Sequence, residues 1–359
     1  MRRRAFLSTT ASALTAAPRV IDDRALVRSS YIFQSRPPLT VSVMPILRLL
    51  PGGRLICVWV SGGDREPLDI NRPLISISEN MGRGWTPARE FPTVDGRMTF
   101  CCEIEEDNGV ATAHLFSGRA ADRYKVVANH RTVSHDGGRT WGALQDYRIV
   151  PDGAVLSQRL RLRDGATIYP FFTLHQKSAV WIHRKGRAPV VSEFVELPGI
   201  ALITPRVVES RDGRLVMLLR AQGQGYLFRS ESTDGGLTWS RAAATAKPSP
   251  TTRFWFKTLS DGRHALIDNP TTVGDGGKAG PRDPLELWLS EDDMRSWSRR
   301  VVLDRGEYHH DRPREKSRLG YTHQLAYPEA VEHQGKLYVA YDYNRRDVVF
   351  LEADMRRIG

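Results

Sequence analysis

The stretch Ser232-Thr233-Asp234-Gly235-Gly236-Leu237-Thr238-Trp239 decides the fold, because its residues favour a tight turn between two short strands. The aspartate side chain can accept hydrogen bonds from backbone N–H groups of the turn, and glycine adopts the positive φ that other residues resist. The threonine and tryptophan that follow supply a β-branched residue and a large ring that can pack against a neighbouring sheet. This eight-residue box is therefore predicted to close a β-hairpin.

The box recurs along the chain. A second full copy occupies residues 134–141, and weaker copies occupy residues 78–85 and 290–297. Repetition of one short motif indicates a repeat architecture. We interpret the box aspartates as turn caps and not as catalysts: Asp136, Asp234 and Asp292. The tryptophans that end the two full copies are expected to be buried between repeats: Trp141 and Trp239.

A second repeat, an x-Gly-x turn followed by an alternating apolar strand, lies between the boxes. Its six copies centre on Gly53, Gly109, Gly165, Gly213, Gly262 and Gly335. They recur roughly every 50 residues, with a longer last interval, which is typical of a β-propeller. The sequence therefore predicts an all-β fold, a six-bladed propeller of four-stranded antiparallel blades. In each blade the x-Gly-x turn joins the first two strands, and in the four blades that contain a box the box joins the last two.

The domain organisation is expected to be simple. Residues 1–25 form a tail or export signal, and residues 26–359 form one propeller domain without an internal linker. The first strand, near residues 31–33, is expected to pair with the last, residues 348–351, because closing the ring removes exposed sheet edges. The longest interval between repeats holds a charged insertion, residues 305–312, between blades five and six.

The N-terminus carries a possible targeting signal. Paired arginines, then Phe6-Leu7, then a weakly apolar stretch of small residues up to Ala17 resemble a bacterial twin-arginine export signal. This pattern predicts a periplasmic or secreted protein, with an unstructured tail as the alternative. No apolar run approaches the ~20 residues that a membrane-spanning helix needs.

The composition narrows the class of ligand. The chain has 52 Lys and Arg against 41 Asp and Glu, a formal net charge of +11, which favours anionic ligands. A nucleic-acid partner is not expected, because the sequence has no zinc-ligand spacing and no long basic run. Three cysteines do not make a disulfide framework. We predict no metal and no cofactor, and the sequence does not indicate an oligomeric state.

The predicted topology also locates the ligand site. Propeller ligands usually bind at the mouth of the central channel, where loops from several blades converge. Alternating strand direction places on this face the loops between second and third strands and the connections between blades. These segments are rich in arginine, with a few carboxylates and tyrosines. Because arginine binds carboxylates through a two-pronged contact, the mouth suits an anionic sugar.

With these features the chain resembles the Asp-box (BNR-repeat) sialidases, over nearly all of residues 30–355. The resemblance implies a glycoside hydrolase on a six-bladed propeller. In that family three arginines hold the substrate carboxylate, a tyrosine activated by a glutamate is the nucleophile, and an aspartate is the acid/base.

Four positions match the motifs of the family. The resemblance implies that Asp69 is the acid/base, that Arg220 and Arg282 are the second and third arginines, and that Tyr327, in Ala326-Tyr327-Pro328, is the nucleophile. The mouth supplies two further arginines as candidates for substrate binding: Arg72 and Arg345.

Two other positions depart from the family. Val43, before Met44-Pro45, stands where the first arginine is expected, and Thr204, before Pro205, stands where the glutamate is expected. Tyrosine is a poor nucleophile without a base to take its proton. Glu329 and His323 are the candidate replacements. We therefore expect weak or no hydrolysis of ordinary sialosides.

Three functions remain open at this point. The first is a sialidase-like, exo-acting glycoside hydrolase that removes an acidic or related sugar from a glycan end. The second is a polysaccharide lyase acting on a uronic acid, in which Arg220 and Arg282 neutralise the carboxylate while Tyr327 and His323 shuttle protons. The third is a propeller that binds carbohydrate without catalysis, since fold alone does not confer function.

Overall fold

The computed structural model describes residues 19–122, 127–306 and 323–358. The predicted export signal, up to Ala17, lies outside the described residues, and so do residues 307–312 of the charged insertion. None of the helices in the described ranges is long and apolar enough to cross a membrane.

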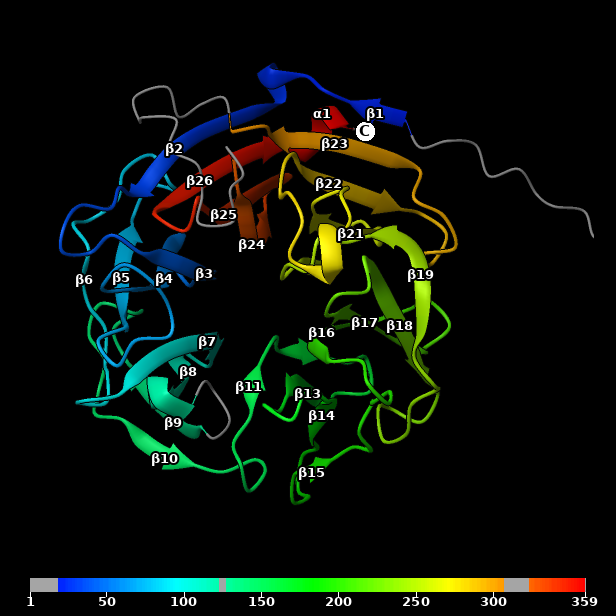
Figure 1. Cartoon of the computed structure of the whole chain (residues 1–359), viewed down its shortest axis with the longest axis horizontal. Coiled ribbons are helices and arrows are strands. Elements are labelled where there is room, and N and C mark those ends of the chain that lie inside the picture. Colours follow the sequence, from blue (N-terminus) through cyan, green and yellow to red (C-terminus); the bar gives the residue numbers. More distant parts are fainter. Residues whose placement is uncertain (1–18, 123–126, 307–322, 359) are drawn as a thin grey trace, which may run out of the picture.

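Six antiparallel blades surround a central axis, and Figure 1 looks down that axis. Blade one consists of β3 (Ser42–Leu50), β4 (Arg54–Ser61), β5 (Arg72–Ser78) and β6 (Arg89–Glu90). Blade two consists of β7 (Met98–Asp107), β8 (Val110–Gly118), β9 (Ala128–Ser134) and β10 (Gln145–Tyr147). Blade three consists of β11 (Val155–Leu156), β12 (Leu160–Arg161), β13 (Thr167–Phe172), β14 (Ser178–His183) and β15 (Val190–Val191).

The second half of the ring follows the same plan. Blade four consists of β16 (Leu202–Glu209), β17 (Leu215–Ala221), β18 (Tyr226–Ser232) and β19 (Ala243–Pro248). Blade five consists of β20 (Trp255–Thr258), β21 (His264–Asp268), β22 (Leu285–Ser290) and β23 (Arg299–Asp304). Blade six consists of β24 (Leu325–His333), β25 (Lys336–Tyr343), β26 (Asp347–Asp354) and β2 (Val27–Phe33). The predicted all-β propeller is confirmed.

Two sheets have one strand more than the basic plan. In blade three the innermost strand is interrupted, so that β11 and β12 both pair with β13. In blade five, β1 (Arg19–Ile21) adds to the outer edge in parallel with β23. The strand β1 lies within the segment that we expected to be a tail. The only helices in the described ranges are short: η1 (Arg24–Leu26), η2 (Ala120–Asp122), η3 (Asp275–Gly277) and α1 (Met355–Ile358).

The ring closes through blade six, as predicted. The strand β2 pairs with β26, and Ser29 lies opposite Leu351 and Tyr31 opposite Val349. The N-terminal strand is therefore the outermost strand of the blade that the C-terminal residues build. This arrangement joins the two ends of the described chain and leaves no open end in the ring.

The boxes are hydrogen-bonded turns. The Asp234 carboxylate accepts a hydrogen bond from the Thr238 N–H at 3.0 Å and another from the Thr238 hydroxyl at 2.6 Å, while the Ser232 hydroxyl accepts one from the Gly236 N–H at 3.0 Å. Burial acts to raise the pKa of Asp234, but the hydrogen bonds from Thr238 and Ser232 lower it to about 2. The interpretation of the box aspartate as a turn cap is confirmed for this copy.

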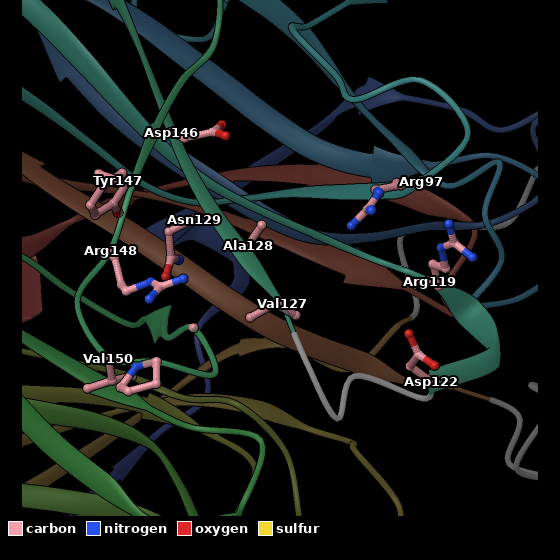
Figure 2. A pocket seen from close by; sticks show the side chains of 12 residues that line it. Arg97, Arg119, Asp122, Val127, Ala128, Asn129, Asp146, Tyr147, Arg148 and Val150 are labelled. Carbon is pink, nitrogen blue, oxygen red and sulfur yellow. The ribbon is translucent and has the colours of Figure 1, made fainter.

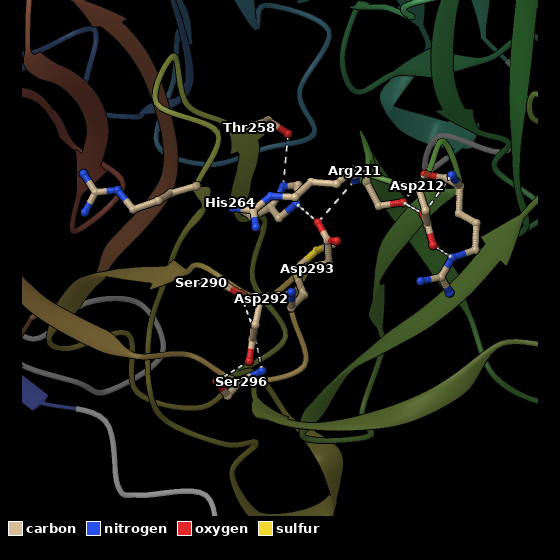
Figure 3. A network of polar contacts seen from close by, with 12 residues as sticks. Arg211, Asp212, Thr258, His264, Ser290, Asp292, Asp293 and Ser296 are labelled. Atoms are coloured by element: carbon tan, nitrogen blue, oxygen red, sulfur yellow. Dashed lines mark hydrogen bonds and ion pairs between the residues drawn. The ribbon is translucent and has the colours of Figure 1, made fainter.

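The weakest copy forms the same turn, with Met294 in place of glycine. Its Asp292 carboxylate accepts hydrogen bonds from the N–H and hydroxyl of Ser296 at 2.9 and 2.7 Å, as Figure 3 shows. The next residue, Asp293, accepts a hydrogen bond from the backbone N–H of Arg211 at 3.3 Å and lies 3.0 Å from Nε2 of His264. Asp293 therefore links this turn in blade five to a turn of blade four.

The box tryptophans are half-buried, and the expectation of full burial was wrong. The indole N–H of Trp239 donates to the Gly236 carbonyl at 3.0 Å, which holds one edge of the ring against its own turn. The Trp141 ring packs edge-on against Phe91, from the connection between blades one and two, with the ring centroids 5.0 Å apart. Each ring covers the end of an apolar core and keeps one side open to solvent.

Candidate functional site

A cavity of about 320 Å³ lies at the mouth of the central channel, on the face that the topology predicted. Its walls come from the innermost strands, the loop after β4 and the segment between β10 and β13. Phe100, Phe116 and Phe172 make one side apolar, while Glu66, Arg220 and Tyr327 lie among the polar lining residues.

Three innermost strands enter this cavity through the same backbone irregularity, a β-bulge next to a proline. The bulges lie at Met44-Pro45, Thr204-Pro205 and Tyr327-Pro328, and the residue before each proline has a positive φ of 56°, 49° and 54°. Proline cannot donate to the strand ladder, and a bulge redirects a side chain. All three pre-proline residues line the cavity.

This bulge corrects one prediction in blade one. Val43, which we placed where the first arginine of the family stands, is fully buried in an apolar cluster. Met44 lines the cavity instead. The reason is that the bulge displaces the alternation of side chains by one residue, so that the position before Pro45 faces the ligand space.

Tyr327 lies at the centre of the polar part of the site. Its side chain is 8% exposed, and the Arg282 guanidinium carbon lies 5.3 Å from the centroid of its ring. Burial acts to raise the pKa of the Tyr327 phenol, but Arg282, Arg220 and Arg345 together bring it below the ordinary value. A larger phenolate fraction makes tyrosine a better nucleophile or base.

Two of these arginines have unused hydrogen-bond donors. The Nε of Arg220 and both the Nε and Nη1 of Arg282 are buried and have no hydrogen-bond partner. Neither arginine forms an ion pair with a carboxylate of the described residues. Burial lowers the pKa of Arg220, and Tyr327 acts in the opposite direction. Buried donors of this kind are satisfied in most proteins, so these groups can bind an acceptor that the described part of the chain does not supply.

Glu66 is the only carboxylate among the described residues that line the cavity. Its Oε1 lies 2.6 Å from Nη2 of Arg345, and this pair sits close enough to Tyr327 to influence its pKa. Behind them lies Asp342, which is fully buried. Burial raises the pKa of Asp342 to about 7, against the opposing effect of Arg345 and Arg282.

An ion network crosses the channel beneath the cavity. Glu329 is 1% exposed, and its carboxylate contacts Nη1 of Arg48 at 2.8 Å, Nη2 of Arg253 at 3.3 Å and Nη2 of Arg206 at closer range. Burial acts to raise the pKa of Glu329, but these arginines lower it to about 2. Arg48 also donates to Glu103 at 2.7 Å.

The buried network therefore holds three arginines against two glutamates. Arg253 is the member that also lines the central cavity, and its Nε has no hydrogen-bond partner. Glu329 and Arg206 face a second cavity, of about 250 Å³, further along the channel. The excess positive charge of the network therefore lies next to the inner end of the central cavity.

Of the predicted site residues, the structure gathers Tyr327, Arg220, Arg282 and Arg345 around one space. Asp69 does not line this cavity; it is exposed, and its carboxylate accepts a hydrogen bond from the Ala120 N–H at 2.6 Å. 

The remaining predicted residues also lie elsewhere. Arg72 is exposed and lies 3.2 Å from Glu90. His323 is absent from the cavity lining, and its Nδ1 lies 2.8 Å from the Tyr343 hydroxyl. Glu329 lies beneath the cavity in the ion network described above.

Sequence reasoning assigned no role to four residues of the site: Met44, Glu66, Arg253 and Asp342. A signal existed for two of them. Glu66 belongs to the same loop as the predicted residue Asp69. Arg253 comes just before the innermost strand of blade five, a position similar to that of Met44 at the start of the innermost strand of blade one. Among the residues of known placement, no cluster of three or more His, Cys, Asp or Glu side chains could hold a metal ion.

Comparison with solved structures shows the same architecture in sialidases. The Hadza microbial sialidase Hz136 superposes with a TM-score of 0.69 at 15% identity, over 88% of this chain and 66% of that protein. The NanB sialidase from Streptococcus pneumoniae gives 0.66 at 13% identity, over 91% of this chain and 70% of that protein. A protein of unknown function from Dyadobacter fermentans superposes with a TM-score of 0.65 at 15% identity, over 92% of this chain and 99% of that protein.

At these identities the likeness shows the fold alone, and the chain spans only about two thirds of the length of the microbial sialidase. A search of the curated proteins found no significant match. The model of the BNR repeat-like domain, however, matches residues 53–339, which is most of the propeller. With its boxed turns and its six blades, the chain belongs to the BNR repeat-like domain family.

Proposed function

We propose that the central cavity binds an acidic sugar at the end of a glycan and that the protein hydrolyses the glycosidic bond of that sugar. The observation that carries this proposal is the set of unpaired arginine donors around Tyr327, on Arg220, Arg253 and Arg282. A ligand carboxylate would supply the missing acceptors. Each charge-assisted hydrogen bond of this kind contributes roughly 1.5–3 kcal/mol.

Tyr327 is the proposed nucleophile. Its phenolate oxygen attacks the anomeric carbon, the bond from that carbon to the leaving oxygen breaks, and Glu66 gives its proton to the leaving oxygen. Water then attacks the same carbon, Glu66 takes a proton from the water, and the Tyr327 phenolate leaves. We assign proton transfer to Glu66, and not to Asp69, because Glu66 lines the cavity and Asp69 does not.

The resting ion pair between Glu66 and Arg345 fits this scheme. The Glu66 carboxyl group lies 2.6 Å from Arg345, and an incoming carboxylate would compete for the same guanidinium. When the substrate takes that contact, the Glu66 side chain is released from Arg345 and is available to the leaving oxygen. Substrate binding would thus help to position the acid.

Ordinary sialosides are not the expected substrates. The blade-one position that faces the cavity is Met44, which supplies no cation, and the blade-four position is Thr204, which supplies no carboxylate. The third arginine here is Arg253, which comes from blade five and therefore approaches from another direction. An acidic sugar whose carboxylate is placed differently from that of sialic acid would fit these three cations better.

The test is a screen of aryl glycosides and acidic polysaccharides, read both as free reducing sugar and as ultraviolet absorbance. On the polysaccharides, hydrolysis releases reducing sugar without a new ultraviolet band. We expect Tyr327→Phe to reduce the rate by several powers of ten, because it removes the attacking oxygen. The matched control is Tyr226→Phe, at an exposed position on β18, which should behave as wild type. Equal rates for wild type and Tyr327→Phe would contradict the proposal.

A lyase remains the second candidate, because a tyrosine with a lowered pKa beside arginines could also act as a base. Tyr327 would remove the proton at C5 of a uronic acid, the C4–O bond would break, and a C4=C5 double bond would form that absorbs in the ultraviolet. His323 lies against Tyr343, so the proton for the leaving oxygen would have to come from Glu66. Binding without either product would indicate a carbohydrate-binding propeller.

A further inference from the structure

A third and larger cavity, of about 700 Å³, lies beside the ligand site and has no part in the chemistry described above. We call it the outer cleft. It lies on blade two, against β9, β10 and the segment 148–153 that leads to blade three, and Figure 2 shows its lining. The lining includes three arginines, one from each of three chain segments: Arg97, Arg119 and Arg148.

These arginines are exposed, and none of them forms an ion pair with a carboxylate of the described residues. Arg97 and Arg148 extend from opposite sides into the space between them (Figure 2). Of the two aspartates in the lining, Asp146 already contacts Nδ1 of His130 at 2.6 Å, and Asp122 is the other. The cleft therefore carries an excess of positive charge with free donors.

The wall of the cleft is a fixed structure. Asn129, which is 3% exposed, donates to the Ala154 carbonyl at 2.6 Å and accepts from the Ala154 N–H at 3.0 Å. Gly153 has a φ of +79°, and a Cβ there would lie 2.0 Å from the Val127 carbonyl oxygen, so only glycine fits. These contacts hold the segment that carries Arg148 against β9.

The outer cleft and the central cavity are lined by neighbouring residues of two chain segments. In one segment Phe116 lines the central cavity and Arg119 lines the cleft; in the other Val155 lines the central cavity and Gly153 lines the cleft. An extended chain rises about 3.3 Å per residue, so the backbones of these paired lining residues lie at most roughly 7–10 Å apart. A short run of linked sugars can span that distance.

We propose that the outer cleft binds the internal acidic units of a polysaccharide whose end occupies the central cavity. This inference rests on the proposed function and extends it from a single acidic sugar to a chain with repeated negative charges. Arg97, Arg119 and Arg148 are the binding residues, because their planar guanidinium groups match carboxylate and sulfate oxygens. Since they are exposed, their contribution falls as ionic strength rises.

The test is calorimetric binding of two series, galacturonate oligomers and heparin-derived oligosaccharides, from the monosaccharide or disaccharide to the hexasaccharide. Wild type is expected to gain about tenfold in affinity with chain length, because each exposed ion pair adds a small favourable contribution. The variant Arg97→Met/Arg148→Met should lose this gain and keep wild-type affinity for the shortest ligand. Arg211→Met, at an exposed arginine in a turn on the opposite face, is the control.

The outcomes separate the two proposals. Binding of the shortest ligand without any gain from length overturns the outer cleft and leaves the proposed function intact. A gain in affinity with length that persists in the double variant also overturns the cleft, because the polysaccharide must then lie elsewhere on the protein. Loss of the length effect at 0.5 M salt, together with its loss in the double variant, supports the cleft. Absence of binding in both series overturns the two proposals together.

Discussion

Replacing Glu329 with glutamine should be the most damaging conservative substitution in the channel. The carboxylate of Glu329 is shared by Arg48, Arg206 and Arg253, and all four groups are largely buried. A neutral amide can accept hydrogen bonds but cannot balance charge. Among the residues that the structure describes, Glu103 would then be the only anion in contact with this group of cations.

The structure gives the size of the effect in two ways. The pKa of Glu329 is about 2 against an ordinary 4.5, which corresponds to roughly 3 kcal/mol of preferential stabilisation of the ionised form. Breaking a buried ion pair by removing one partner destabilises proteins by about 3–5 kcal/mol. We therefore expect Glu329→Gln to lower the free energy of unfolding by about 3–5 kcal/mol at pH 7.

The measurement is urea unfolding of wild type and variant at several pH values. Because the pKa of Glu329 is depressed in the folded protein, its stabilising contribution is complete above about pH 4.5 and is lost as the pH falls towards 2. The difference in unfolding free energy between the two proteins should therefore shrink over that interval. Adding Arg206→Met to the variant should recover part of the loss, because it removes one unpaired buried cation.

The control is Glu196→Gln, at a carboxylate whose side chain is 61% exposed and lies 3.5 Å from Lys177. An exposed pair of this kind contributes about 0–1 kcal/mol, so this variant should unfold almost as wild type does. A Glu329→Gln protein within 1 kcal/mol of wild type at pH 7, with an unchanged pH profile, would show that the channel network is not held by charge balance.

Three further predictions follow from the fold and the site. Trp239→Ala should lower the free energy of unfolding by about 2–4 kcal/mol, less than for a fully buried ring, as calorimetry can measure. Burial raises the pKa of Asp342 to about 7, so this group increasingly destabilises the folded protein as the pH rises from about 4 to 7. Asp342→Asn should therefore be a few kcal/mol more stable than wild type at about pH 8 and equal to it at about pH 3. Urea unfolding at both pH values can check this. Met44→Arg combined with Thr204→Glu should raise the rate on an aryl sialoside above that of wild type, and vigorous wild-type turnover would contradict the role given to these two positions.

The fold could be predicted because its signals are local. Each box and each x-Gly-x turn contains, within a few residues, the side chains that close it, and the hydrogen bonds between Asp234 and Thr238 connect positions four apart. The order of turns then fixed the face on which each strand ends. Tyr327, Arg220 and Arg282 were found for that reason, since all three lie close to ends of strands on that face.

The rest of the site depends on contacts between distant residues. Asn71 shapes the loop after β4 by donating to the Gly62 carbonyl at 2.6 Å and accepting from the Leu68 N–H at 2.7 Å. This loop directs Glu66 into the cavity and leaves Asp69 outside. The spacing of these residues along the chain does not show which of the two enters the cavity. Arg253 was missed because its partner in the channel, Glu329, lies in another blade.

The most direct test of the central claim is the pKa of the Tyr327 phenol, measured by ultraviolet difference titration of wild type minus Tyr327→Phe. Three arginines around the ring should make Tyr327 ionise below pH 10, and an acidic sugar in the cavity should shift the ionisation upward by neutralising them. Arg282→Met should produce an upward shift without any ligand. A Tyr327 that ionises at or above pH 10, and does not respond to Arg282→Met, would contradict the account of this site.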